Sequence, residues 1–389
     1  MTLAHQGTIS LNTVVATLTL ANLLPGSDFG AFALAYSAAL VALGVNRCLV
    51  TDPAIISVGE HNTANTSLAL GYFASQSRRW IGLVIGETTL AIVLAALTGH
   101  PFLIVASLLF PLYAAADSLR YVNTSIEREL VAAAGDIALF VATVATAGLL
   151  LSSDLPATYF FLGSWGLGPL VAVLLTFPHR GWKTAGRRLP SRSLSRNLLI
   201  DYMAQTGLAQ AALFVIALIL SVSAIGDLRL IQTLFGMASV ALQAVAGLGL
   251  ATAVRAKIRG TSYLDEYTRR AAGALLLVAI VNLLLIWSLP TNIIEVLVGG
   301  RAAEVVALAP FMFVFVAAQA YSLVPMLRLR ASGNTRAILQ ARLICGPAQL
   351  LAPIVLARFF GTAGALCGLA AAALSVGIVA NLLRYHRRR

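Results

Sequence analysis

The chain has few charged residues for its length. Of its 389 residues, 11% are Asp, Glu, Lys or Arg and 59% are hydrophobic, whereas a soluble domain carries about 25% charged residues. Acidic residues are the scarcest, with 15 against 27 Lys and Arg, so that the net charge is +12. The longest polar stretches have roughly 20 residues, which is too short to bury a core of their own. These shortages argue against any soluble domain.

Motifs of catalysis and metal binding are also missing. The three cysteines, Cys48, Cys345 and Cys367, lie far apart inside apolar stretches, which gives neither a disulfide framework nor a metal-ligand spacing. The five histidines are scattered as well, and the sequence contains no P-loop, no HExxH and no nucleophile motif. We therefore expect no enzyme activity, no cofactor and no metal, and any energy for transport must come from an ion gradient or the substrate gradient.

Long apolar stretches dominate what remains. A membrane span needs ~20 mostly apolar residues, and twelve stretches of about that length run through the chain. The sequence therefore predicts an all-α integral membrane protein with about twelve transmembrane helices. The stretches are residues 8–24, 32–57, 80–98, 101–119, 131–151, 158–177, 198–221, 229–253, 271–289, 303–326, 338–357 and 361–383.

Basic residues fall almost entirely on alternate sides of these stretches. Every second connection, starting after the second stretch and ending with the C-terminal tail, holds 22 of the 27 Lys and Arg. The opposite connections hold only Arg229, Arg301 and Arg358. Basic loops stay in the cytoplasm, so this pattern predicts a multi-pass protein of the inner (cytoplasmic) membrane with both termini cytoplasmic. Loop charge beside anionic lipid explains the net charge, and no nucleic-acid partner is needed.

The largest basic connection divides the chain in two. Residues 178–197 are rich in Arg, Ser, Pro and Gly and have six apolar stretches on each side. We predict an N-terminal six-helix lobe over 1–177, a cytoplasmic linker over 178–197 and a C-terminal six-helix lobe with a basic tail over 198–389. A faint repeat places Gly30 and Gly226 at equivalent positions, as in two-lobed secondary transporters. We further expect Gly30 to permit a tight turn, and residues 64–79 to form a short amphipathic segment that lies at the cytoplasmic interface.

The junction of the first two stretches carries a family resemblance. After a leucine-rich stretch come Pro25, Asp28, Phe29, Gly30 and Phe32. This pattern resembles the first helix junction of the polysaccharide flippases in the multidrug/oligosaccharidyl-lipid/polysaccharide exporter superfamily. The resemblance covers about 60 residues by motif, and the two-lobed arrangement of spans extends it over the chain. It implies alternating access and a cationic central cavity that holds the head group of a lipid-linked oligosaccharide.

Arginine inside a span is the sharpest binding candidate. A charge at the bilayer centre costs at least ~2.5–3.5 kcal/mol, and such a residue usually faces a partner or a wet cavity. Arg47 lies deep in the second stretch beside Asn46, and Arg342 lies in the eleventh, near a Gly346-Pro347 pair that should break or kink the helix. We predict that Arg47, Asn46 and Arg342 line the substrate cavity. The alternative for Arg47 is a structural pair with Asp52 or an arginine that reaches the cytoplasmic face.

Three acidic residues inside spans are candidates for ion coupling. Glu87, Asp136 and Asp201 could bind a proton or Na⁺ that drives exchange. The alternative is that interfacial water satisfies them. Asp117 lies three residues before Arg120, which favours an ion pair at the end of a span over a role in transport.

Two functions other than the flippase stay open. One is an ion-coupled drug or metabolite antiporter, although the loop after the second stretch lacks the pattern usual in major facilitators. The other is a membrane-embedded glycosyltransferase or polymerase, against which the short external loops argue. For the flippase we expect a lipid-linked oligosaccharide substrate, membrane lipid, and a glycan polymerase and glycosyltransferases as partners.

Overall fold

A computed structural model describes residues 2–53, 66–125, 128–153, 155–177, 192–332 and 334–386. Within these ranges the chain is almost entirely helical, as predicted, and contains no strand. Eight described helices are long and apolar enough to cross a membrane, or nine if one bent pair counts as a single span. Each of the twelve predicted stretches overlaps a described helix. Twelve exceeds nine because α16 counts once, α1 contributes only the shorter apolar helix Gly7–Leu23, and α4 is not among the candidate spans.

The helices fall into two compact units, which we describe separately. The first unit comprises Met1–Leu24 and Ala35–Met203, and the second comprises Pro25–Leu34 and Ala204–Arg389. The predicted linker over 178–197 lies mostly outside the described residues, so the three-part division stays a prediction.

The first unit packs its helices around α5 and α6. Helix α1 packs against α6, α5 packs against α4 and α8, and the short α9 packs against the π-helical turn η1. The bounds are α1 Thr2–Leu23, α2 Gly26–Asn46, η1 Arg47–Thr51, α4 Thr66–Thr98, α5 Pro101–Ser125, α6 Glu129–Leu151, α7 Thr158–Phe161, η2 Leu162–Leu167, α8 Gly168–Thr176 and α9 Arg192–Tyr202. Gly99, with φ 73°, lets the chain reverse between α4 and α5.

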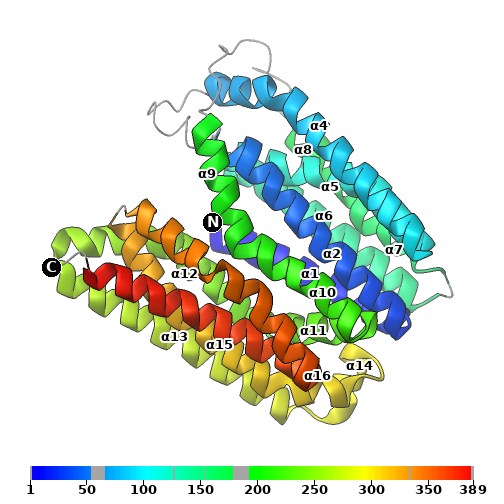
Figure 1. Cartoon of the computed structure of the whole chain (residues 1–389). Helices are drawn as coiled ribbons and strands as arrows, with labels where there is room; N and C mark the ends of the chain where they lie inside the picture. Colours follow the sequence, from blue (N-terminus) through cyan, green and yellow to red (C-terminus); the bar gives the residue numbers. More distant parts are fainter. Residues whose placement is uncertain are drawn as a thin grey trace. The chain divides into compact units, whose positions relative to one another are not determined.

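The second unit is built on α13, α15 and α16, which run alongside one another in Figure 1. The bounds are η3 Met203–Gly207, α10 Leu208–Ile219, α11 Val222–Leu234, α12 Gly236–Arg259, α13 Thr261–Ser288, α14 Thr291–Val298, α15 Ala302–Ala331 and α16 Thr335–His386. Ser221 caps α11 by accepting a hydrogen bond from the backbone N–H of Ala224 at 3.1 Å. Helix α11 and the start of α12 meet at a bend of 67°.

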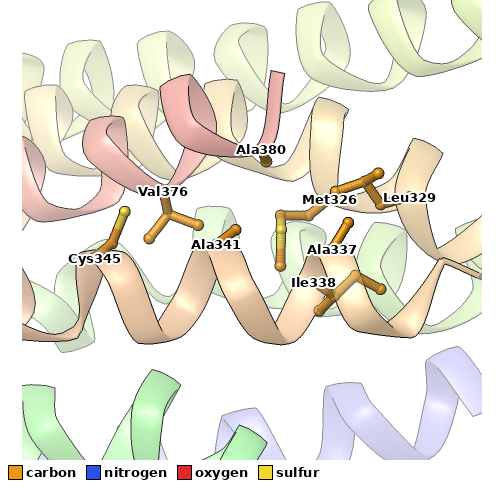
Figure 2. Packing of buried hydrophobic residues seen from close by; sticks show 8 residues of the cluster. All are labelled: Met326, Leu329, Ala337, Ile338, Ala341, Cys345, Val376 and Ala380. Carbon is orange, nitrogen blue, oxygen red and sulfur yellow. The ribbon is translucent and has the colours of Figure 1, made fainter. Parts of the chain in front are cut away.

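A hydrophobic cluster packs α15 against α16 in the second unit. It combines larger aliphatic side chains with alanines and one cysteine, and the small residues let the helix backbones come close. Figure 2 shows how one cluster joins the end of α15 to both halves of α16: Met326, Leu329, Ala337, Ile338, Ala341, Cys345, Val376 and Ala380.

Two local expectations change. Gly30 lies inside α2 rather than in a turn, and a side chain there would come within 2.0 Å of the carbonyl oxygen of Val222. Glycine is therefore needed for a close approach of two helices. The helix continues through Gly346 and Pro347, and α16 is interrupted instead at Gly361, with φ 62°. Residues 66–79, predicted as an interfacial segment, form the first part of α4, which runs from Thr66 to Thr98. Figure 1 shows the first turns of α4 at an angle to the rest.

Candidate functional site

A charged cluster in the first unit surrounds Arg47. The Arg47 guanidinium donates two hydrogen bonds to Asp117, from Nε to Oδ2 at 2.9 Å and from Nη2 to Oδ1 at 2.6 Å. Such a two-pronged pair fixes the orientation of the guanidinium as well as its position. The acid that holds Arg47 is thus Asp117 on α5, 70 residues away in sequence, whereas the partner considered from the sequence was Asp52.

Asp117 serves two arginines at once. Arg120 Nη2 donates to the same Oδ1 of Asp117 at 2.7 Å, three residues along α5. The predicted pair of Asp117 and Arg120 is therefore present, but it belongs to a larger network. Both guanidinium groups lie over the ring of Tyr121, each 4.8 Å from its centroid. The electron-rich face of Tyr121 lowers the cost of keeping two cations close together.

Asp136 brings a second carboxylate to this cluster. Its Oδ1 lies 3.9 Å from Arg120 Nη1, an ion pair that is too long to be a hydrogen bond. Asp117, Arg120 and Asp136 line a small cavity of about 30 Å³, together with Asn12 and Tyr113. That volume suits a single water molecule or a small cation.

Asn46 connects the cluster to α4. It is buried, and its amide donates to Glu87 Oε2 at 2.6 Å and to the Ala42 carbonyl at 3.3 Å. Arg47 follows directly and begins the π-helical turn η1, a local widening of the helix that often marks functional positions. One turn of backbone therefore directs Asn46 toward Glu87 and Arg47 toward Asp117.

Asp201 lies on α9, the helix that packs against η1. The neighbouring Tyr202 donates from its hydroxyl to the Leu40 carbonyl at 2.9 Å. Its ring lies so close to the backbone of Gly44 that a Cβ there would be 1.9 Å from a ring carbon. Tyr202 thus anchors α9 to α2, and Asp201 belongs to the same unit as Arg47.

Arg342 lies in the second unit. It is buried, with 3% of its surface exposed, and it lines a cavity of about 440 Å³ between α10, α12, α15 and α16. Of the six predicted site residues, the structure therefore brings Asn46, Arg47, Glu87 and Asp136 into one neighbourhood and places Arg342 in a separate cavity.

Several residues of these sites escape a sequence-based prediction. Tyr121 has no motif, and Arg330, which shares the cavity with Arg342, reads as ordinary loop charge. The pairing of Arg47 with Asp117 has no local signal, although both are ionisable residues near apolar stretches. In the part of the chain that the structure describes, no group of three His, Cys, Asp or Glu could hold a metal ion.

No family model matches the sequence, and no curated protein matches it. Solved structures do match, and they are membrane transporters. An inward-facing multidrug resistance MATE family transporter of the MOP superfamily is 12% identical, over 97% of this chain and 94% of that chain, with a TM-score of 0.74. An outward-facing multidrug resistance MATE family transporter is 14% identical, over 99% and 94%, with a TM-score of 0.59.

A third match comes from Pyrococcus furiosus. This MOP superfamily transporter, described as having a binding pocket of reverse polarity that suggests a different function, is 12% identical over 99% of this chain and 93% of that chain, with a TM-score of 0.62. The chain thus has the fold of the transporters in this superfamily. Identities this low establish the fold alone.

Proposed function

We propose that the chain is a membrane transporter that works by alternating access. The observation that carries the proposal is the fold, because it matches transporters in both inward-facing and outward-facing conformations over nearly the whole chain. A charged network among apolar helices adds support. Ionisable residues at membrane depth are costly, so they usually mark a substrate or ion pathway.

For the substrate we propose a lipid-linked oligosaccharide that is moved from the cytoplasmic to the outer leaflet. Arg47 supports this choice, because Asp117 holds its guanidinium at Nε and Nη2 while a third of the side chain remains exposed. A guanidinium that is already oriented loses little entropy when a diphosphate binds to its remaining donors. Asn46 next to it is the second proposed cavity residue of the first unit and donates to Glu87, and Arg342 is the proposed anion contact of the second unit.

For energy coupling, Asp136 is the strongest of the three acidic candidates. It borders the small cavity beside Arg120, where a proton or a small cation could change the charge balance of the network. Glu87 and Asp201 remain weaker candidates, since Glu87 is already bonded to Asn46. A cation held beside Asp136 would compete with Arg120 for that carboxylate.

The alternative is an ion-coupled drug or metabolite antiporter. Two of the matched structures are multidrug resistance transporters, and the same fold can host different substrates. The transporter from Pyrococcus furiosus shows that pocket polarity varies within the superfamily. A drug antiporter for organic cations would need an acidic binding region, whereas the cavity of about 440 Å³ in the second unit has two arginines in its lining.

The proposed setting is the inner membrane, with both termini in the cytoplasm. A flippase there would act between the glycosyltransferases that build the oligosaccharide and a glycan polymerase that uses it outside. No ATP-binding segment is recognisable in the sequence.

Reconstitution in proteoliposomes tests the proposal. The full chain is inserted into vesicles that contain either a fluorescent polyprenyl-diphosphate oligosaccharide or a fluorescent organic cation. We expect protein-dependent movement of the lipid-linked sugar between leaflets and none of the cation. Movement of the cation alone, driven by a proton or Na⁺ gradient, would replace the flippase by the antiporter. Movement of neither would reject both.

A further inference from the structure

The segment Pro25–Leu34 belongs to the second unit, although the chain on both sides of it, up to Leu24 and from Ala35, belongs to the first. We propose that this segment is the outer gate of the transporter, held closed on α11 by Arg301, and that it separates from α11 when the transport path opens to the outside. The inference rests on the proposed alternating access for the role of the gate. The contact itself can be tested without a substrate.

The predicted orientation places this contact on the external side of the membrane. Gly26 at the start of α2, Ser223 at the start of α11 and Arg301 before α15 all lie in connections that alternate with the basic ones. Basic loops stay in the cytoplasm, so these three connections are expected outside. A contact among them lies at the outer end of the second unit in that orientation.

Two glycines let α2 and α11 cross in close contact. A Cβ added to Gly30 would lie 2.0 Å from the carbonyl oxygen of Val222. A Cβ added to Gly226 would lie 2.9 Å from the Phe29 ring. The faint repeat places Gly30 and Gly226 at equivalent positions, so the two copies of the repeat touch at matching points. Alternating access moves such copies against each other, and a contact of this kind must break when its end of the protein opens.

Arg301 contacts both of the crossing helices. Its guanidinium carbon lies 4.9 Å from the centroid of the Phe29 ring on α2, and its Nη1 lies 3.9 Å from Asp227 Oδ1 on α11. The Phe29 side chain is fully buried, and a cation over an aromatic ring is held more strongly where water is excluded. Arg301 immediately precedes α15, where the helix dipole disfavours a cation. Its contacts to α2 and α11 offset that cost.

The Arg301 contact is weaker than the charged network of the first unit. Arg47 bonds to Asp117 at 2.6 and 2.9 Å, whereas the 3.9 Å between Arg301 and Asp227 is too long for a hydrogen bond. Arg301 Nη1 is buried and has no hydrogen-bond acceptor among the residues that the structure describes. A buried donor without an acceptor is costly, and water relieves that cost when the gate opens. The free-energy difference between closed and open states is therefore small.

Cysteine labelling of the full chain in intact cells tests the role of Arg301. In a background without the three native cysteines, Ser239→Cys places a thiol in the cavity of the second unit. An impermeant maleimide outside should label it slowly in this parent. In Arg301→Gln the rate should rise roughly 2- to 30-fold, because loss of the cation–π contact raises the open population by that factor. Arg358→Gln, at an exposed position in another connection predicted to be external, is the matched control and should label as the parent does.

A second variant protects this test against misfolding. Phe29→Leu keeps a buried apolar side chain, removes the ring under the guanidinium and leaves the charge of Arg301 in place. It too should speed labelling at position 239, with membrane levels checked by immunoblot. Labelling at the parent rate in both Arg301→Gln and Phe29→Leu would show that Arg301 does not hold the segment.

A covalent lock tests the gate independently of Arg301. A Cβ added to Gly26 would lie 3.1 Å from Ser223 Oγ, so Gly26→Cys and Ser223→Cys together are within reach of a disulfide. Oxidation with copper phenanthroline should form it and reduce labelling of position 239 to background, read by mass spectrometry of its peptide. Reduction should restore labelling, and either substitution alone should have no effect. Failure of the disulfide to form, or unchanged labelling once it has formed, would overturn the proposal.

The gate and the proposed function can fail separately. If the disulfide stops labelling but the proteoliposomes move neither lipid-linked sugar nor organic cation, the gate stands and the proposed transport is wrong. If lipid-linked sugar moves at the parent rate with the disulfide formed, the flippase stands and Pro25–Leu34 is not its gate.

Discussion

Asp117 Oδ1 accepts hydrogen bonds from Arg47 and Arg120 at 2.6 and 2.7 Å, so that one carboxylate compensates two guanidinium groups. Only 8% of the Asp117 side chain is exposed. The acid therefore contributes more to this network than either arginine does. Either arginine can be removed while Asp117 keeps a partner, but removal of the Asp117 charge leaves both arginines without it.

The first prediction follows from this asymmetry. Asp117→Asn should destabilise the protein by up to about 3–5 kcal/mol, the usual cost of breaking a buried ion pair, because Arg47 loses the acid that it bonds to and Arg120 keeps only Asp136 at 3.9 Å. Arg47→Gln should cost clearly less, because Arg120 still bonds to Asp117. Apparent melting temperatures of the purified proteins in one detergent would measure the order. Equal melting temperatures for the two variants would contradict this asymmetry, and melting temperatures equal to that of the parent protein would mean that the network contributes little to stability.

The second prediction concerns transport. Arg47→Ala should abolish lipid-linked sugar export while the protein still inserts, and Arg47→Lys should restore only part of it. A lysine is a point charge and cannot make the two parallel bonds that a guanidinium makes to Asp117 or to a diphosphate. Complementation of a flippase-deficient strain, with membrane levels checked by immunoblot, gives the readout.

A surface arginine is the control for that experiment. Among the residues that the structure describes, Arg270 pairs with Glu266 one turn away, on an exposed face of α13, and such pairs are worth at most about 1 kcal/mol. Arg270→Ala should complement fully. Full complementation by Arg47→Ala as well would leave Arg47 with a structural role and would favour the antiporter.

The sequence predicts the helical class and the neighbourhood of the site for different reasons. Apolar length requires helices at membrane depth, because unpaired backbone groups are too costly there. The cost of intramembrane charge then selects Arg47, Glu87 and Asp136, three residues that the structure brings close together. Neither argument needs knowledge of which helices touch.

What could not be predicted depends on which helices are neighbours. Nothing local relates Arg47 to an acid 70 residues away, and Tyr121 is one aromatic residue among many. The Gly-Pro pair at 346–347 misleads because a Pro-containing helix can continue when its neighbours stabilise it; the interruption falls at Gly361, where φ is 62°. Gly30 and Gly226, which the faint repeat places at equivalent positions, lie next to each other in the fold. A Cβ added to Gly226 would be 3.4 Å from the Gly30 nitrogen.

The third prediction tests topology. In a background where Cys48, Cys345 and Cys367 are replaced by Ala, a cysteine at position 154 should react with an impermeant maleimide from outside intact cells. A cysteine at position 187 should react only after the cells are opened. The expectation rests on the 22 of 27 basic residues that alternate connections hold. Labelling of both positions from the same side would exclude the orientation.

The last prediction separates two kinds of helical glycine. Gly30→Ala should destabilise the second unit, because its Cβ would lie 2.0 Å from the Val222 carbonyl oxygen, and backbone cannot move aside as a flexible side chain can. Overpacking of this kind costs about 1–3 kcal/mol.

Gly148→Ala is the matched control, since Gly148 lies in α6 with nothing within 4 Å of the added Cβ. There alanine should leave stability unchanged or raise it by up to about 1 kcal/mol, the difference in helix propensity. Thermal unfolding of both variants in the same detergent decides the matter: if Gly30→Ala melts no lower than Gly148→Ala, the close approach of α2 and α11 is not a feature of the folded protein.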